Sequence, residues 1–292
     1  MPARRPTPLA GGANGLAHHA RFAYAQVVGI IAPRAIVHLD NDVVAGLIND
    51  QAARDFVSKV RWNGADIYLC PSVVREMCTA PTEIRKKLVE AAQAHCAGFS
   101  NLPVADMLTM EIRSLAEGKR VPPIPTLPIS RLSEILDDAD AAKMKNALSK
   151  ERRAESTSIL DGLVQSLKPQ ARKQQFEPFM RMCTPYIMRI FIEKASDSVG
   201  GEVLKRAADQ PRFSRGDKYG LIGVCAAISA NVYRRSRGIG KGGGCFTDLP
   251  MLVEVSHADI LLTRDTELFE CSKLVAAAIV DARPMVILVP QP

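Results

Sequence analysis

Acidic residues follow directly after apolar runs that are far apart in this 292-residue chain. Residues 35–39 run into Asp40, residues 260–264 run into Asp265, and residues 66–70 lead into a short helix that carries Glu76. Short apolar runs bounded by polar residues are typical of central strands in a parallel sheet, where both faces are buried. Because parallel strands end on one edge and α/β proteins build their sites there, we expect these carboxylates to meet. A group of like charges needs a cation, and the pattern therefore predicts a metal site.

The remaining elements can be expected from periodicity and from turn residues. Residues 1–16 are rich in Pro, Gly, Ala and Arg and are expected to be flexible, and Pro33 ends a helix over 17–32. Residues 119–130 are proline-rich and predict extended chain, whereas 131–210 predict mostly helix with no strong strand. The core is expected to hold strands at 35–39, 66–70, 259–263 and 285–289, and helices at 43–48, 51–62, 71–77, 81–95, 217–235 and 266–279.

Positive charge is concentrated in two zones of the chain. The net charge is +7, while residues 143–194 hold eleven Lys and Arg against five Asp and Glu, and residues 205–241 hold nine against two. Such zones beside an acidic site suit a protein that binds a polyanion, because they attract it while the carboxylates hold the metal. Each zone taken singly is more often a solvated helix face.

The motifs resemble those of the PIN-domain nuclease family. The first is Val-His-Leu-Asp with Asp40, and the second is Pro-Ser-Val-Val-Arg-Glu with Glu76. The last is a helix that starts at Asp248, followed by a strand and the Thr-x-Asp signature of Thr263 and Asp265. The resemblance covers about 35–95 and 215–290, with no counterpart for the middle of the chain. The chain is longer than compact toxin members of the family, and Asp42 stands where these often carry Ser, Thr or Asn.

The resemblance implies a three-layer α/β/α fold with a central parallel sheet. The chain would divide into a basic N-terminal segment with a helix (1–34) and a PIN-like domain (35–292). A mainly helical, basic elaboration would occupy about 100–210.

The resemblance also implies Mg²⁺- or Mn²⁺-dependent cleavage of phosphodiesters, most often in RNA. Hard divalent cations choose oxygen ligands, and Mg²⁺ keeps waters while using one or two carboxylates directly. We expect Asp40 and Asp265 to be direct ligands, and Glu76 and Asp248 to complete the shell or to orient the attacking water. Thr263 would donate a hydrogen bond to a carboxylate or to a substrate phosphate. Further contacts to substrate or site are expected from Asp42, Lys241, Arg234 and Arg235.

Each acid also has a structural interpretation. Asp40 and Asp248 could be helix caps, and Glu76 could be a surface residue paired with an arginine. Asp217 is more simply a cap, and Asp259 lies at the end of its strand opposite to the predicted site. All four acids falling at matching strand ends by chance is much less probable than any one of them doing so, and this favours the joint interpretation.

Two other functions compete with the nuclease. Asp40-Asn-Asp42 resembles the nucleophile motif of haloacid-dehalogenase phosphatases, but no acidic pair follows Asp265, so that alternative is poor. A PIN-like scaffold that binds nucleic acid or a protein without cutting is the stronger alternative.

The composition predicts a reduced intracellular protein. The seven cysteines are scattered, odd in number and without a Cys-x-x-Cys pair, which disfavours a zinc site. The uncharged stretch 22–33 is too short to span a membrane. We expect a cytoplasmic protein that binds nucleic acid, RNA more than DNA, and no membrane. A homo-oligomer or a protein partner is compatible with the sequence.

Overall fold

The computed structural model describes residues 34–100, 102, 104–117, 119, 124–136, 158, 161–194, 221–239, 254–255, 258–278 and 285–290. The predictions for 1–33, the start of the helix from Asp217, Asp248 and Lys241 fall outside these residues.

The fold is α/β and is built on a six-stranded, mostly parallel sheet in the order β4-β3-β2-β1-β5-β6. The strands comprise Ile36–Leu39 (β1), Asp66–Leu69 (β2), Gly98–Phe99 (β3), Leu127–Pro128 (β4), Ile260–Thr263 (β5) and Met285–Leu288 (β6). All neighbours run parallel except β3 and β4, which are antiparallel. The four strands predicted from apolar runs are confirmed. The two short strands β3 and β4 were not predicted, and β4 lies within 100–210, so the sheet extends into that stretch.

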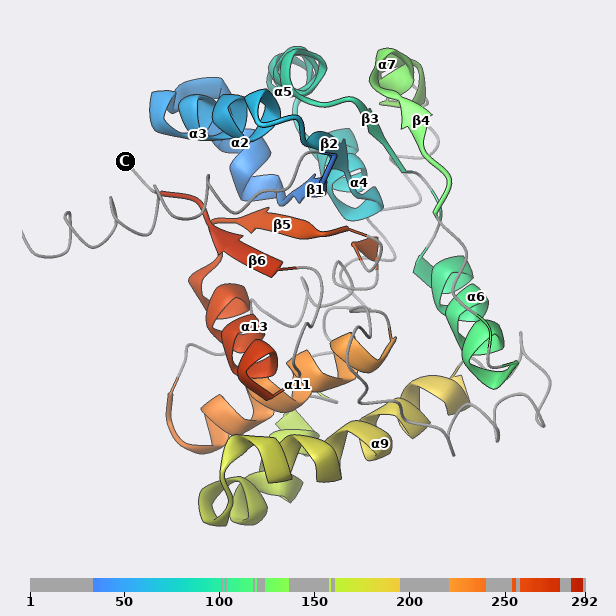
Figure 1. The fold of residues 1–292 in the computed structure, drawn as a ribbon, viewed down its shortest axis with the longest axis vertical. Helices are drawn as coiled ribbons and strands as arrows, with labels where there is room; N and C mark the ends of the chain where they lie inside the picture. The colour runs from blue at the N-terminus through green and yellow to red at the C-terminus, as the bar shows by residue number, and fades with distance from the viewer. Residues whose placement is uncertain are drawn as a thin grey trace, which may run out of the picture.

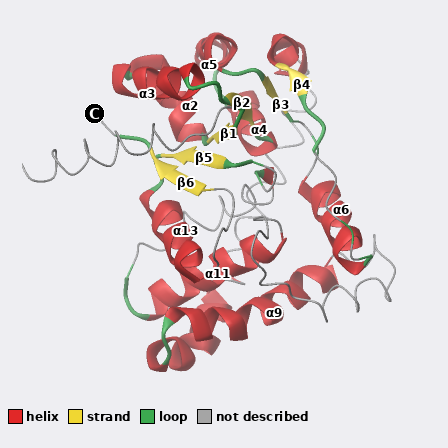
Figure 2. Ribbon diagram, in the orientation of Figure 1, coloured by secondary structure: helices red, strands yellow, loops and turns green. Residues whose placement is uncertain are grey.

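Helices lie on both sides of this sheet (Figure 1). One side carries α2 to α5, with bounds Asn41–Asn49, Gln51–Trp62, Pro71–Thr79 and Thr82–His95. The other side carries α13 (Thr266–Ala278), followed by α11 (Leu221–Ser236) and α9 (Phe176–Lys194). Figure 2 shows that helix dominates the described chain outside the sheet. The remaining elements are α6 (Val104–Ala116), a 3₁₀ turn at Ile129–Arg131, α7 (Leu132–Leu136) and a helix over 161–173.

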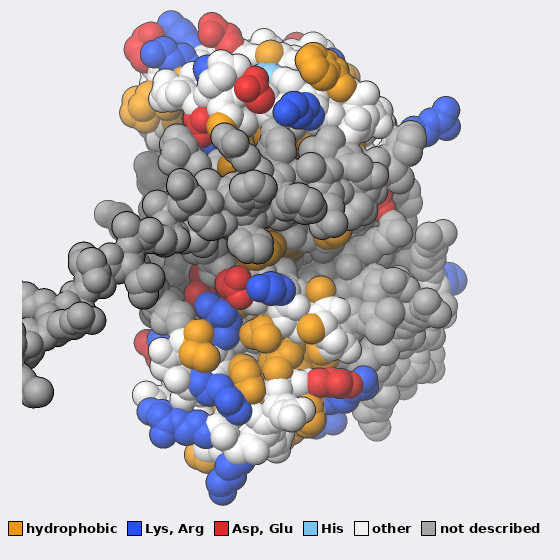
Figure 3. Space-filling model, turned by 60° about the vertical axis from the view of Figure 1, so that its left-hand side comes forward, with side chains coloured by type: hydrophobic (Ala, Val, Ile, Leu, Met, Phe, Trp, Pro, Cys, Tyr) orange, Lys and Arg blue, Asp and Glu red, His pale blue; other side chains and the backbone are white. Residues whose placement is uncertain are grey.

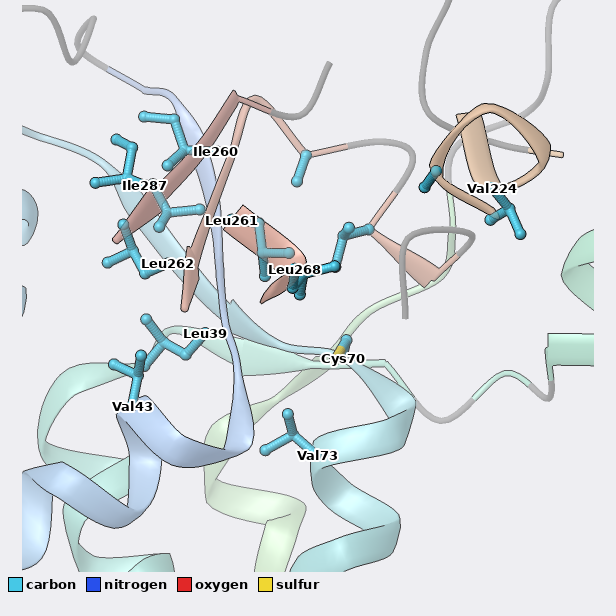
Figure 4. Packing of buried hydrophobic residues seen from close by; sticks show 14 of the residues in the cluster. Leu39, Val43, Cys70, Val73, Val224, Ile260, Leu261, Leu262, Leu268 and Ile287 are labelled. Carbon is cyan, nitrogen blue, oxygen red and sulfur yellow. The ribbon is translucent and has the colours of Figure 1, made fainter. Parts of the chain in front are cut away.

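The core is continuous from one helical side through the sheet to the other. Strand β5 is buried along its whole length, as expected for a strand covered on both faces. Val43 from α2 and Leu268 from α13 are both fully buried and approach the sheet from opposite sides (Figure 4). This packing fixes the starts of α2 and α13 against the ends of β1 and β5.

Arg264 ties the end of β5 to the α2 side of the sheet. Its Nη2 forms an ion pair with Asp50, the N-cap of α3, and donates to the Pro290 carbonyl at 3.1 Å. The guanidinium crosses α2 at Gly46, where a Cβ atom would lie 2.6 Å from Nη1. The pairing with Arg264 lowers the pKa of Asp50 below its usual value. A side chain at position 46 would therefore force the Arg264 guanidinium to shift.

None of the helices in the described ranges is long and apolar enough to cross a membrane.

Candidate functional site

Asp40 occupies the junction between the end of β1 and the start of α2. It is the N-cap of α2, and its Oδ1 accepts a hydrogen bond from the Asn41 backbone N–H at 2.6 Å. The residue is 8% exposed. Burial raises its pKa to about 6, against the lowering effect of hydrogen bonds from Thr263 and Asn41, and the charges of Asp42 and Asp265 raise it further. A carboxylate that is costly to ionise would gain from a cation at this position.

Thr263 connects Asp40 to Asp265. Its hydroxyl donates to Asp40 Oδ2 at 2.5 Å and accepts from the Asp265 backbone N–H at 3.0 Å. Asp265 in turn caps α13, since its Oδ1 accepts from the N–H groups of Glu267 and Leu268 at 2.7 and 3.1 Å. The fully buried threonine therefore fixes one carboxylate and the backbone that carries the other. This is the role expected for it from sequence, with a carboxylate as the acceptor.

These residues lie where the strand order of the sheet reverses. From β1 the chain continues to β2 and β3 on one side, whereas β5 and β6 lie on the other. The Asp40 backbone N–H donates to the Leu262 carbonyl at 2.9 Å, which joins the ends of β1 and β5 directly. In open α/β sheets, ligands bind outside the carboxyl ends of the strands at such a reversal. Asp40 and Asp265 therefore stand at the position where this fold class most often binds its ligand.

The other predicted acids are placed differently. Asp42 is exposed in the first turn of α2 and acts on Asp40 through its charge. Glu76 is exposed on α4, and Asp248 lies outside the described residues. Within the described ranges, no three His, Cys, Asp or Glu side chains are grouped so that they could hold a metal. The described acids thus form a linked pair with a third charge nearby, and Glu76 is not shown to join them.

The two predicted arginines are engaged in ion pairs. Arg234 donates from Nε and Nη2 to the two carboxylate oxygens of Glu267, each at 3.1 Å, and both side chains are mostly buried. Arg235 pairs with Asp161 at 2.7 Å. Because Glu267 lies in the first turn of α13, Arg234 fixes α11 against the helix that Asp265 caps. This geometry favours a structural role for Arg234 over a direct substrate contact.

Glu254, Arg75 and Cys70 also lie at the carboxyl edge of the sheet and were not among the site residues predicted from sequence. Glu254 is 1% exposed, accepts from the Ser72 backbone N–H at 2.7 Å and forms an ion pair with Arg75. Cys70, at the end of β2, is fully buried. Burial raises the pKa of the Cys70 thiol far above its ordinary value, and the charges of Glu254 and Asp40 raise it further, so this thiol is no nucleophile. The one sequence signal for Glu254 was its place in the motif that begins at Asp248.

Comparison with known proteins adds nothing to this geometry: no family model, no curated protein and no solved structure matches the chain.

Proposed function

We propose that this protein is a Mg²⁺- or Mn²⁺-dependent nuclease of PIN-like, three-layer architecture, acting on RNA in preference to DNA. The observation that carries the proposal is the Asp40–Thr263–Asp265 link at the reversal of strand order. Two carboxylates at one edge of the sheet, near enough for the charge of Asp265 to act on Asp40, suit an ion that keeps most of its waters, since Mg²⁺ commonly uses only one or two direct carboxylates. The raised pKa of Asp40 supports the same conclusion, because a bound cation would offset the cost of its ionisation.

Each site residue would have its own role in binding the metal ion. Asp40 and Asp265 would hold the ion, and Thr263 would keep the Asp40 carboxylate oriented through its hydroxyl. When bound, such an ion supplies Lewis-acid stabilisation of a phosphoryl oxygen and activation of water. Asp42, exposed beside Asp40, would add negative charge that favours the divalent ion.

The side of the molecule that carries α9, α11 and α13 is rich in positively charged residues, which attract the negatively charged backbone of a nucleic acid. Across 161–194, 221–239 and 266–278 there are ten Lys and Arg against five Asp and Glu, although Arg234 is mostly buried against Glu267. Figure 3 shows Lys and Arg side chains over the lower half of the molecule, where α9, α11 and α13 lie. A basic surface of this kind raises the rate and affinity of polyanion binding.

The proposal is tested by matched Asp→Asn variants. Asp40→Asn and Asp265→Asn should lose Mn²⁺-dependent cleavage of single-stranded RNA, and Mn²⁺ should raise the melting temperature of the wild type but not of these variants. Asp259→Asn is the control, since Asp259 accepts from the Ile36 N–H at the opposite end of β5. It should cleave like the wild type. Equal degradation by wild type and Asp40→Asn would show that the activity is a contaminant and would end the proposal.

A non-catalytic nucleic-acid-binding scaffold is the second candidate. It is favoured by the double use of Asp40 and Asp265 as helix caps and by the exposed position of Glu76. Binding of RNA with neither cleavage nor stabilisation by Mn²⁺ would establish this alternative.

A further inference from the structure

A buried acid holds the start of α4 at the carboxyl edge of the sheet. Glu254 comes from the segment before β5, yet its two carboxylate oxygens engage α4: Oε2 accepts from the Ser72 N–H and Oε1 pairs with Arg75. The Glu254 side chain is fully buried. A buried carboxylate is retained only with such partners, because its desolvation is costly.

This ion pair lies at the same carboxyl edge of the sheet as Asp40. Ser72 is two residues beyond Cys70, the residue that follows β2, and β2 pairs with β1 along its whole length. The negative charges of Glu254 and Asp40 both raise the pKa of the Cys70 thiol. Figure 4 shows Cys70 at the start of α4, and Leu39, which precedes Asp40, near the start of α2. Asp40 and the helix that carries Arg75 therefore follow the carboxyl ends of neighbouring strands.

The guanidinium of Arg75 is anchored on one side only. Both of its hydrogen bonds to described residues start from Nη2, which donates to Glu254 Oε1 and, at 2.9 Å, to Ser72 Oγ. The side chain is 38% exposed, although its partner is fully buried. Nε and Nη1 are left without a hydrogen bond to the described chain. Arg264, which follows β5, differs from Arg75: its side chain is 12% exposed, pairs with Asp50 and donates a hydrogen bond to the Pro290 carbonyl.

We propose that Arg75 binds a phosphate group of the nucleic acid at this edge, and that Glu254 is the positioning residue that orients the guanidinium. The inference rests on the proposed function, which supplies the polyanionic substrate. A phosphodiester that approaches Asp40, Asp42 and Asp265 meets three negative charges, and a fixed cation at the same edge of the sheet reduces that repulsion. Arginine suits this task because its planar fork donates two parallel hydrogen bonds to phosphate.

Binding in the absence of metal tests the proposal without requiring cleavage. The affinity of a short fluorescein-labelled single-stranded RNA would be measured by anisotropy in EDTA, over a series of NaCl concentrations. We expect Arg75→Ala to weaken binding about tenfold, as for a lost charge-assisted hydrogen bond. It should also lower the slope of log affinity against log salt by about one, as for a lost phosphate contact. The matched control is Arg131→Ala, which removes an exposed arginine from its ion pair with Glu134 and should change neither quantity.

Arg75→Lys and Glu254→Gln separate a phosphate contact from a purely structural ion pair. The lysine variant keeps the charge and the fold, so the salt slope should persist while affinity falls by less than in Arg75→Ala. In a Glu254→Gln background, Arg75→Ala should cost less affinity than in the wild type, because the unanchored guanidinium contributes less.

The possible outcomes distinguish the inference about Arg75 from the nuclease proposal. If Arg75→Ala lowers the melting temperature but leaves affinity and salt slope at wild-type values, Arg75 is a structural anchor and the inference is wrong, whatever Asp40→Asn does to cleavage. If wild type binds RNA with an Arg75-dependent slope but never cleaves it, the inference stands and the nuclease assignment fails. If wild type binds no RNA, both fail.

Discussion

Asp40 accepts two hydrogen bonds, and its ionisation is nevertheless costly because burial outweighs them. Its pKa is about 6 in the folded chain against 3.8 for an ordinary aspartate. The folded state thus binds the proton more tightly than the unfolded state, and stability falls as the pH rises from 3.8 through about 6. Without metal, the charge on Asp40 is therefore a source of instability at neutral pH.

Asp40→Asn should accordingly stabilise the metal-free protein. The amide can still accept from Asn41 and donate to Thr263, and asparagine is a good N-cap. We expect a gain on the order of 1–3 kcal/mol well above about pH 6, which disappears below 3.8. Urea unfolding of both proteins in EDTA, once above about pH 6 and once below pH 3.8, measures this difference in the free energy of unfolding. Equal destabilisation at both pH values would mean that Asp40 serves only as a cap.

Thr263→Val tests the link between the two acids. It removes the donor to Asp40 Oδ2 and the acceptor of the Asp265 N–H, and an unpaired buried polar group costs about 1–3 kcal/mol. Because the Thr263 hydrogen bond lowers the pKa of Asp40, its loss should move that pKa upward, and the pH at which metal-free stability falls should move with it. Thr263→Ser, which retains the hydroxyl, is the control. An unmoved pH profile in Thr263→Val would refute the link.

The site residues differ in how readily a sequence reveals them. The positions of Asp40 and Asp265 at the carboxyl edge were predictable, because each comes one or two residues after the end of a largely apolar strand. Glu254 and Arg75 were not, because they meet across 179 residues and no local pattern pairs them. The exposure of Glu76 depends on which face of α4 is buried, and that is decided by packing of Val73, Val74 and Met77.

At the scale of elements, the strands of four residues were predictable and the strands of two residues were not. β1, β2, β5 and β6 each contain three or four apolar side chains in a short run, and such a run indicates burial. β3 and β4 contain two residues each, and Gly98 and Pro128 have no preference for strand, so only pairing with neighbours makes them part of the sheet. The proline-rich stretch was predicted as extended chain, but its place at the sheet edge depends on the tertiary fold.

Gly46→Ala tests how Arg264 joins β5 to α2. The new Cβ would lie 2.6 Å from Nη1, so the guanidinium must shift, which strains its contacts with Asp50 and the Pro290 carbonyl. We expect a loss of about 1–3 kcal/mol, typical of overpacking. In an Arg264→Ala background the same change should instead gain up to about 1 kcal/mol from helix propensity. Chemical unfolding of the wild type, the two single variants and the double variant gives the coupling free energy between the two positions. Additive effects would show that the close approach is unimportant.

At the scale of the molecule, the separation of charge is the feature that binding experiments can test. Lys173 and Arg189 are exposed on the helical side, on 161–173 and α9. Reversing both charges (Lys173→Glu with Arg189→Glu) should weaken RNA binding equally for unrelated sequences and lower the salt slope by about two. The melting temperature should stay near that of the wild type, since both side chains are exposed. Unchanged affinity would place the nucleic acid on another surface.

The proline at the end of β4 has a consequence for self-association. Pro128 has no backbone N–H, and β4 offers only two residues to any chain that approaches its outer side. Short edge strands with proline discourage the addition of a further strand, which is how many sheet proteins avoid fibre-like stacking. Copies of this protein should therefore not polymerise by lengthening their sheets across β4, and assemblies that form there would have to join through side chains.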